Sequence, residues 1–211
     1  MRRSLPLWAL LLQACDKPPV PPPPANLGPP QGILRLDRSG TAAWDLVKDA
    51  NPGFPSLAFK LSYYGPKSRL EVRHEGWHKG KTVGSGKGNH LIQLPLVDDA
   101  AFGFSDGTAP DGRSVAVVHT SLPAESKKPG GAGGSRLGDT QQYAVPPLKM
   151  RSKRTYEPAW PLEIQDGQEA ILWAVFVDEP ADLPAGASVE ERAKRADTAW
   201  IFRIRTADEP K

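Results

Sequence analysis

An uninterrupted apolar run occupies residues 170–177, with the sequence AILWAVFV. A strand with one solvated face alternates apolar and polar residues, whereas a strand covered on both faces is apolar throughout. The run is too short to cross a membrane as a helix, and it is rich in β-branched and aromatic residues. We therefore expect it to form a central strand of a sheet.

Patterns on both sides of this run predict further strands, which alternate with one apolar face except for a more buried strand at 114–119. They lie at residues 57–63, 69–73, 90–96, 114–119 and 198–206. Pro95 indicates an edge strand, because proline cannot donate a ladder hydrogen bond. Asp166-Gly167 indicates a tight turn between a strand at residues 162–164 and the apolar run.

Two glycine-rich segments are expected to be loops, because glycine has the greatest conformational freedom. Residues 84–88 predict a flexible hairpin loop, and residues 122–142 predict a mobile excursion. The only helix expected lies near residues 189–196, where Ser188 and Glu191 have the spacing of a capping box.

These elements, without alternation of strands and helices, predict an all-β fold. We expect an antiparallel β-sandwich of about eight strands with one short helix, and a closed β-barrel is the alternative. The expected core consists of large apolar side chains that face inward: Phe59, Leu61, Leu70, Val72, Ile92, Leu94, Val117, Trp173, Phe176, Trp200 and Phe202.

The N-terminus has the features of a secretory signal peptide. It starts with MRR, continues with a mostly apolar stretch, and places the small residue Ala14 before Cys15. Leu12, Ala14 and Cys15 resemble the lipobox of bacterial lipoproteins. The resemblance implies that residues 1–14 are removed and that Cys15, the only cysteine of the chain, carries a diacylglycerol and an N-terminal acyl chain such as palmitate. An ordinary signal peptide that happens to contain a cysteine is the alternative.

Proline dominates the segment that follows. Eight of the 14 residues from 17 to 30 are proline, which favours an extended polyproline II conformation. At about 3.1 Å per residue, this segment would hold a folded domain up to ~40 Å from the acyl chains. We therefore expect a signal peptide at 1–14, an acylated cysteine with a proline-rich tether at 15–30, and a β-sandwich domain at 31–211. A proline-rich ligand for another protein is the alternative function of the tether.

The charge of the chain argues against a nucleic-acid partner. Loss of Arg2 and Arg3 with the signal peptide lowers the formal net charge of +3 by two, so the processed chain is close to neutral. One basic cluster remains at residues 149–154, for which a solvated loop or an edge strand is the favoured interpretation. No apolar run is long enough for a membrane-spanning helix.

Residues 74–78, HEGWH, match the H-E-x-x-H motif of zinc peptidases. In such an enzyme His74 and His78 bind zinc from one face of a helix, and Glu75 acts on a zinc-bound water. Here the motif continues an alternating strand and contains a glycine, which disfavours a helix. We expect a strand end followed by a loop, with no metal and no cofactor. His74, Glu75 and His78 remain the catalytic candidates of the alternative function.

Two further features could carry function. Residues 103–107, GFSDG, match the G-x-S-x-G motif of serine hydrolases, but turn-forming residues follow in place of the helix that this motif requires. His119, the only histidine downstream, is just 14 positions away. Trp77 and Trp160 fall outside the expected strands, where they could bind a sugar or a peptide. The favoured interpretation is that each tryptophan seals one end of the core.

The sequence therefore predicts a lipid-anchored lipoprotein of the bacterial cell envelope that faces the periplasm or the cell exterior. Its expected partners are the membrane, through the acyl chains, and an envelope protein or a cell-wall polymer. A non-catalytic binding or scaffold module is the favoured function. A zinc-dependent envelope hydrolase that uses residues 74–78 is the alternative.

Overall fold

The computed structural model describes residues 32–94, 96–123 and 137–208. One group of strands is β1 (Ile33–Arg38), β2 (Ser56–Tyr64), β5 (Leu96–Thr108), β6 (Ser114–Leu122), β7 (Leu137–Tyr143) and β9 (Leu162–Gln165). The other is β3 (Arg69–His78), β4 (Lys81–Gln93), β8 (Lys153–Tyr156), β10 (Glu169–Val177) and β11 (Thr198–Ala207). The helices are α1 (Ala43–Leu46) and α2 (Val189–Arg195).

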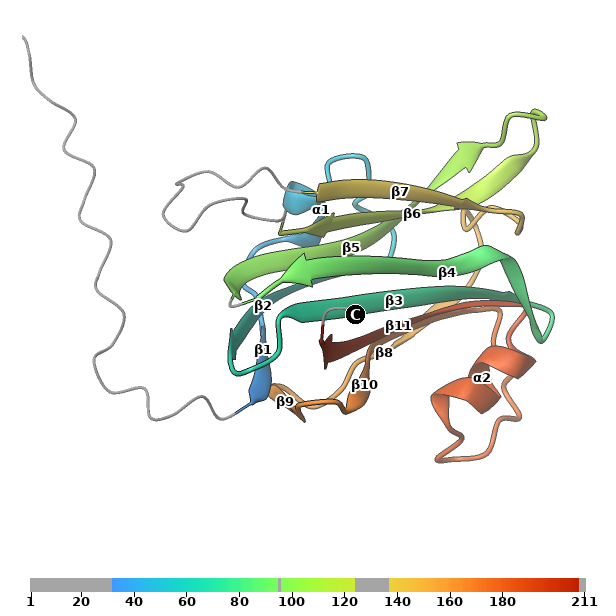
Figure 1. The fold of residues 1–211 in the computed structure, drawn as a ribbon. Helices are drawn as coiled ribbons and strands as arrows, with labels where there is room; N and C mark the ends of the chain where they lie inside the picture. Colours follow the sequence, from blue (N-terminus) through green and yellow to red (C-terminus); the bar gives the residue numbers. More distant parts are fainter. Residues whose placement is uncertain (1–31, 95, 124–136, 209–211) are drawn as a thin grey trace, which may run out of the picture.

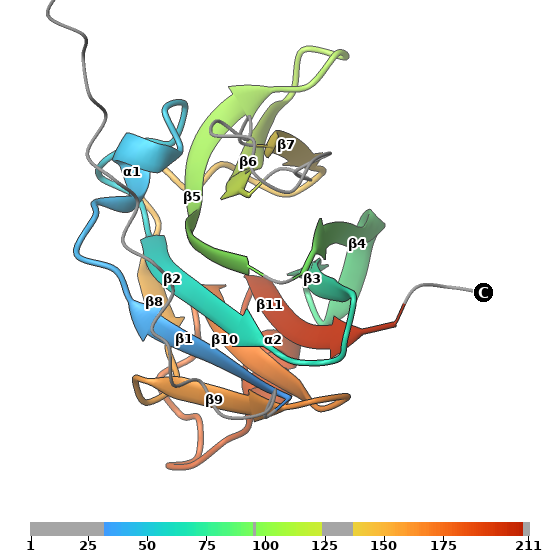
Figure 2. The same ribbon diagram turned by 60° about the vertical axis from the view of Figure 1, so that its left-hand side comes forward.

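The strands form two sheets in which every pairing is antiparallel (Figures 1 and 2). The six-stranded sheet has the order β7-β6-β5-β2-β1-β9, and the five-stranded sheet has the order β4-β3-β11-β10-β8. The predicted all-β sandwich is confirmed. The closed barrel is wrong, because the described strands belong to two separate sheets.

The core lies between the two sheets and is aromatic at its centre. Phe102 and Phe104 of β5 contact Trp173 of β10 and Phe202 of β11, with ring centroids 4.5 to 6.4 Å apart. All the core residues expected from the sequence are buried. Phe176, however, lies in a second cluster on the opposite face of its sheet.

The second cluster explains why residues 170–177 are apolar on both faces. Trp173 and Val175 of β10 face the main core, whereas Ala174 and Phe176 pack with Val189 and Ala193 of α2. β10 is therefore an interior strand that is covered on both sides, as predicted. The capping box at the start of α2 is also confirmed, because Ser188 and Glu191 each accept a hydrogen bond from the other's backbone N–H.

Three local predictions need correction, and a fourth is confirmed. Residues 90–96 do not form one strand, since β4 ends at Gln93 and β5 begins at Leu96. Residues 84–88 lie within β4 and not in a hairpin loop, at the point where the pairing with β3 shifts register between Val83 and Gly88. The predicted turn at Asp166-Gly167 is confirmed, and β9 and β10 on either side of it belong to different sheets. The expected excursion at 122–142 includes strand β7.

Several predictions fall outside the described residues. They are the signal peptide, the acylation of Cys15, the proline-rich tether, the role of Pro95, and the part of the excursion at 124–136. In the described ranges, neither helix has the length and apolar character needed to cross a membrane.

Candidate functional site

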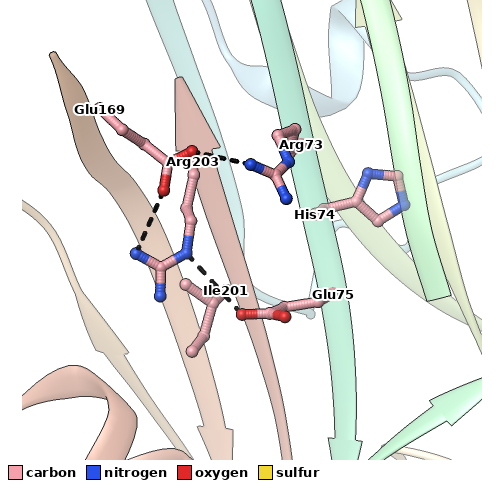
Figure 3. Close-up of a pocket in the computed structure, with 6 residues that line it drawn as sticks. All are labelled: Arg73, His74, Glu75, Glu169, Ile201 and Arg203. Carbon is pink, nitrogen blue, oxygen red and sulfur yellow. Dashed lines mark hydrogen bonds and ion pairs between the residues drawn. The ribbon is translucent and has the colours of Figure 1, made fainter. Parts of the chain in front are cut away.

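The HEGWH segment is the end of strand β3, and a turn at Lys79-Gly80 follows it, as expected. Alternation along the strand buries His74 in the core and turns Glu75 to the outer face, as Figure 3 shows. The His74 ring stacks on Phe202, with centroids 5.5 Å apart, and Nε2 donates a hydrogen bond of 2.9 Å to Gln141 Oε1 of β7. His74 is 1% exposed, so this part of the strand is a core position and not a surface one.

His78 is held at a different place. Its Nδ1 donates to the carbonyl oxygen of Asp197 at 2.9 Å and lies 3.1 Å from Thr198 Oγ1. His78 lies four positions after His74 on β3, so their backbones are about 13 Å apart. Two nitrogens that bind the same zinc ion lie within about 4 Å of each other. The structure therefore does not bring His74, Glu75 and His78 together at one site. The described residues contain no group of three potential metal ligands.

The glycine of the motif has a packing role. A Cβ atom on Gly76 would lie 2.6 Å from Cδ1 and Cε1 of the Tyr143 ring. Such contacts are far inside van der Waals distance, so only glycine lets β3 pass beneath this ring. The segment that matches the zinc-peptidase motif is therefore a strand in which Gly76 serves the packing against Tyr143.

The two tryptophans singled out from the sequence are both partly buried. Trp77 lies within β3 and not outside the strands, and it packs against the cluster beneath α2. Trp160 packs against the main core, and its indole N–H donates a 3.2 Å hydrogen bond to Glu157. Neither ring is presented as an open stacking platform.

A small pocket with a volume of about 60 Å³ lies on the outer face of the five-stranded sheet (Figure 3). Arg203 sits on β11 between Glu75 of β3 and Glu169 of β10. Its guanidinium lies 3.7 Å from Glu75 and 3.8 Å from Glu169, and Arg73 pairs with Glu169 at 3.1 Å.

These ion pairs continue beyond the pocket. Arg203 also pairs with Glu190 of α2 at 2.6 Å, which lowers the pKa of that carboxyl group. On the next rung, Arg205 pairs with Glu71 at 2.6 Å. Alternation in β11 produces the arrangement, because its apolar face lies in the core and its arginines face outward. Each charge is already compensated by a neighbour, so we interpret this pocket as a stabilising network on the sheet surface.

The basic cluster at residues 149–154 is partly an edge strand, as expected, since β8 forms one edge of its sheet. Arg151 forms ion pairs with Asp178 and Asp197. Lys153 lies 4.7 Å from the centre of the Phe54 ring. These two side chains are therefore engaged within the fold.

A larger groove lies beside the β5–β6 hairpin. It has a volume of about 480 Å³ and is lined by residues of the hairpin and of the turn that precedes β8: Asp106, Gly107, Thr108, Ser114, Pro147, Lys149 and Met150. Both carboxylate oxygens of Asp106 accept backbone N–H bonds from that turn, at 2.5 and 2.9 Å. Met150 is 94% exposed and has a φ of 64°, a conformation that is uncommon outside glycine. The volume falls in the range of small-molecule sites, about 300–1,000 Å³.

The GFSDG segment lies inside β5, and the structure brings Ser105 and His119 together. The pairing of β5 with β6 places Gly103 opposite His119, so Ser105 is the diagonal neighbour of His119 on the same face. Ser105 Oγ lies 2.6 Å from His119 Nε2. His119 Nδ1 lies 3.5 Å from Oγ1 of Thr140, which sits directly across from it on β7.

His119 is 5% exposed, and burial lowers its pKa, while the charge of Asp49 acts in the opposite direction. The sequence argues against this pair, because turn-forming residues follow GFSDG and His119 lies only 14 positions after Ser105. Antiparallel pairing of adjacent strands makes that short separation sufficient.

Comparison of the chain with protein-family models, with curated proteins and with solved structures finds no match.

Proposed function

We propose that this protein is a lipoprotein of the bacterial cell envelope, anchored through Cys15, whose β-sandwich acts as a binding or scaffold module. The observation that carries the proposal is the segment Leu12-Gln13-Ala14-Cys15, which follows a basic start and an apolar stretch and holds the only cysteine of the chain. The proline-rich composition of residues 17–30 suits a spacer between a membrane surface and a folded domain.

The described fold is compatible with a tether at its N-terminal side. β1 starts at Ile33 and is an interior strand, paired with β2 on one side and with β9 on the other. Leu34 and Leu36 of β1 are fully buried. The chain after Gly32 therefore enters an interior strand, next to the edge strand β9.

The groove beside Met150 supports a binding role at the other end of the domain. Both ribbon views place the β5–β6 hairpin far from the start of β1 (Figures 1 and 2). A domain tethered before Gly32 could thus turn this groove away from the membrane, toward an envelope protein or a cell-wall polymer. The zinc hydrolase is not supported, because His74 and His78 are bonded at separate places.

Replacement of Cys15 tests the anchor. The full chain is expressed in a bacterium supplied with a radiolabelled or alkyne-bearing fatty acid. We expect the unaltered chain to incorporate the fatty acid and to partition into detergent, and we expect Cys15→Ala to do neither. Pro18→Ala, outside the lipobox-like segment, is the matched control and should behave like the unaltered chain. Equal release of the unaltered chain and the Cys15→Ala chain as soluble protein would refute the anchor.

A photo-crosslinking amino acid at position 150 tests the binding role. We expect it to form a discrete adduct in intact cells, because this position projects into the groove end of the domain. The same amino acid at Tyr64, which is also exposed but lies at the end of β2 beside the start of β1, is the control. The same adducts from both positions, or none from position 150, would contradict a partner at the groove.

A further inference from the structure

We propose that Ser105 and His119 form a nucleophile–base pair that transfers acyl groups from small carboxylic esters. This activity goes beyond the proposed anchoring and binding role and does not depend on it. The geometry that carries the proposal is the 2.6 Å separation of Ser105 Oγ and His119 Nε2 on the outer face of the six-stranded sheet. A nucleophile and a base in catalytic serine sites lie about 2.6–3.2 Å apart.

The surroundings of His119 suit a general base. The ring is nearly completely buried, which favours the neutral form, and a neutral imidazole has one nitrogen free to accept a proton. With the hydrogen on Nδ1, this nitrogen faces Thr140 and Nε2 can accept the Ser105 hydroxyl hydrogen. Thr140 is then a positioning residue for the ring. Asp49 is the charged group that acts on His119, and it favours the imidazolium formed when the proton is taken up.

Ser105 stands between two glycines on the same face of β5. A Cβ atom on Gly103 would lie 2.7 Å from Cβ of Ala50, and one on Gly107 would lie 2.7 Å from Cγ2 of Val117. Both glycines let apolar groups approach the strand on either side of the serine. Ser105 itself remains partly exposed. A partly desolvated hydroxyl that a ligand can still reach is what nucleophilic attack requires.

The reaction balances with water as the only co-reactant. Oγ attacks the carbonyl carbon of the ester while Nε2 takes the hydroxyl proton. The tetrahedral adduct collapses, the bond to the leaving alcohol breaks, and Nε2 returns the proton to that alcohol. Nε2 then deprotonates a water molecule, which attacks the acyl-serine. The second tetrahedral adduct collapses, the bond between the acyl carbon and Oγ breaks, and Nε2 returns the proton to Oγ, which restores Ser105 and releases the carboxylic acid.

The test uses the detergent-purified full chain and a fluorophosphonate probe, with the labelled residue mapped by mass spectrometry. We expect labelling at Ser105 that is abolished by Ser105→Ala, and turnover of p-nitrophenyl acetate that falls with it. His119→Gln should slow labelling about 10²–10⁴-fold, the usual contribution of a general base. Thr140→Val should slow it less and alter its pH profile. Ser62→Ala, at a partly exposed serine of β2 in the same sheet, is the matched control and should label like the unaltered chain.

Three results would overturn the proposal: no labelling of Ser105 in the native protein, labelling no faster than at Ser62, or full labelling of His119→Gln. Circular dichroism establishes whether His119→Gln is folded. If it is not, Ser105→Cys provides the measurement, because a thiol paired with His119 should react with iodoacetamide at a pH well below the ordinary thiol range. An ordinary thiol profile would equally refute the pair and would leave only a structural hydrogen bond.

Discussion

Truncation of Trp173 should be among the most destabilising single changes in this protein. The side chain is fully buried in the middle of β10 and contacts the rings of Phe102, Phe104 and Phe202 at centroid distances of 5.2 to 6.4 Å. Replacing a core tryptophan with alanine costs roughly 3–5 kcal/mol, because transfer free energy is lost and a cavity remains. For a domain of this size, such a loss lowers Tm by roughly 6–20 °C.

The indole N–H of Trp173 makes a sharper comparison possible. Within the described part of the chain it is buried without a hydrogen-bond acceptor. Trp173→Phe keeps most of the ring and removes this unsatisfied donor, whose desolvation costs about 1–3 kcal/mol. We therefore expect Trp173→Phe to change the free energy of unfolding by no more than ~1.5 kcal/mol, close to the upper cost of a volume-conserving core substitution.

Urea unfolding and calorimetry on the two variants provide the measurement, with Trp77→Ala as the control at a partly buried indole. We expect Trp173→Ala to cost more than twice as much as either of the other two changes. Equal losses in the free energy of unfolding for Trp173→Ala and Trp173→Phe would refute this reasoning. They would mean that the indole N–H has a hydrogen-bond acceptor, and that the stability of the core does not depend on filled volume alone.

Three other predictions address histidines and a buried ion pair. Burial lowers the pKa of His119, so below about pH 6.5 the unfolded chain binds a proton more readily than the native chain. The free energy of unfolding should therefore fall as the pH is lowered through this range. His119→Gln should flatten this part of the curve, measured by urea unfolding at a series of pH values. His74→Ala should lower the free energy of unfolding by about 2–4 kcal/mol and His78→Ala by about 1 kcal/mol, because only His74 is fully buried. Thermal melts provide the measurement, and a chelator should change the Tm of neither variant. The Glu179 side chain is 2% exposed, and its two oxygens pair with Arg192 at 2.5 and 3.0 Å. Glu179→Gln should therefore lower the free energy of unfolding by about 3–5 kcal/mol. A loss below about 1 kcal/mol would contradict a stabilising role for this pair.

Strands with strong patterns were predictable, and weakly patterned ones were not. β10, β11 and β2 have clear apolar faces, and each was found within one residue or two of its observed ends. β7 and β8, with sequences LGDTQQY and KRTY, carry almost no apolar signal. They become strands because β6 and β10 offer them hydrogen-bonding edges, a condition that depends on residues far away in the chain.

The candidate sites show the same division. The HEGWH and GFSDG segments look like catalytic motifs in the sequence, and both prove to be strand segments with glycines that admit a neighbouring residue. Alternation along β3 sends His74 and Glu75 to opposite faces, which a helix would not do. The pairing of β5 and β6 creates the contact between Ser105 and His119, which no motif spacing indicated.

The sequence by itself determined the all-β class, the doubly buried strand at 170–177, most of the core, and the capped helix α2, because alternation and capping depend on neighbours within a few residues. It also carries the whole argument for a lipid anchor at Cys15. Only the tertiary structure decided that two sheets form in place of a barrel, that the arginines of β11 meet four glutamates, and that Ser105 meets His119. Those contacts join residues from different strands, and their register is set by which edges pair and which faces are buried, a property of the assembled sheets and not of any single segment.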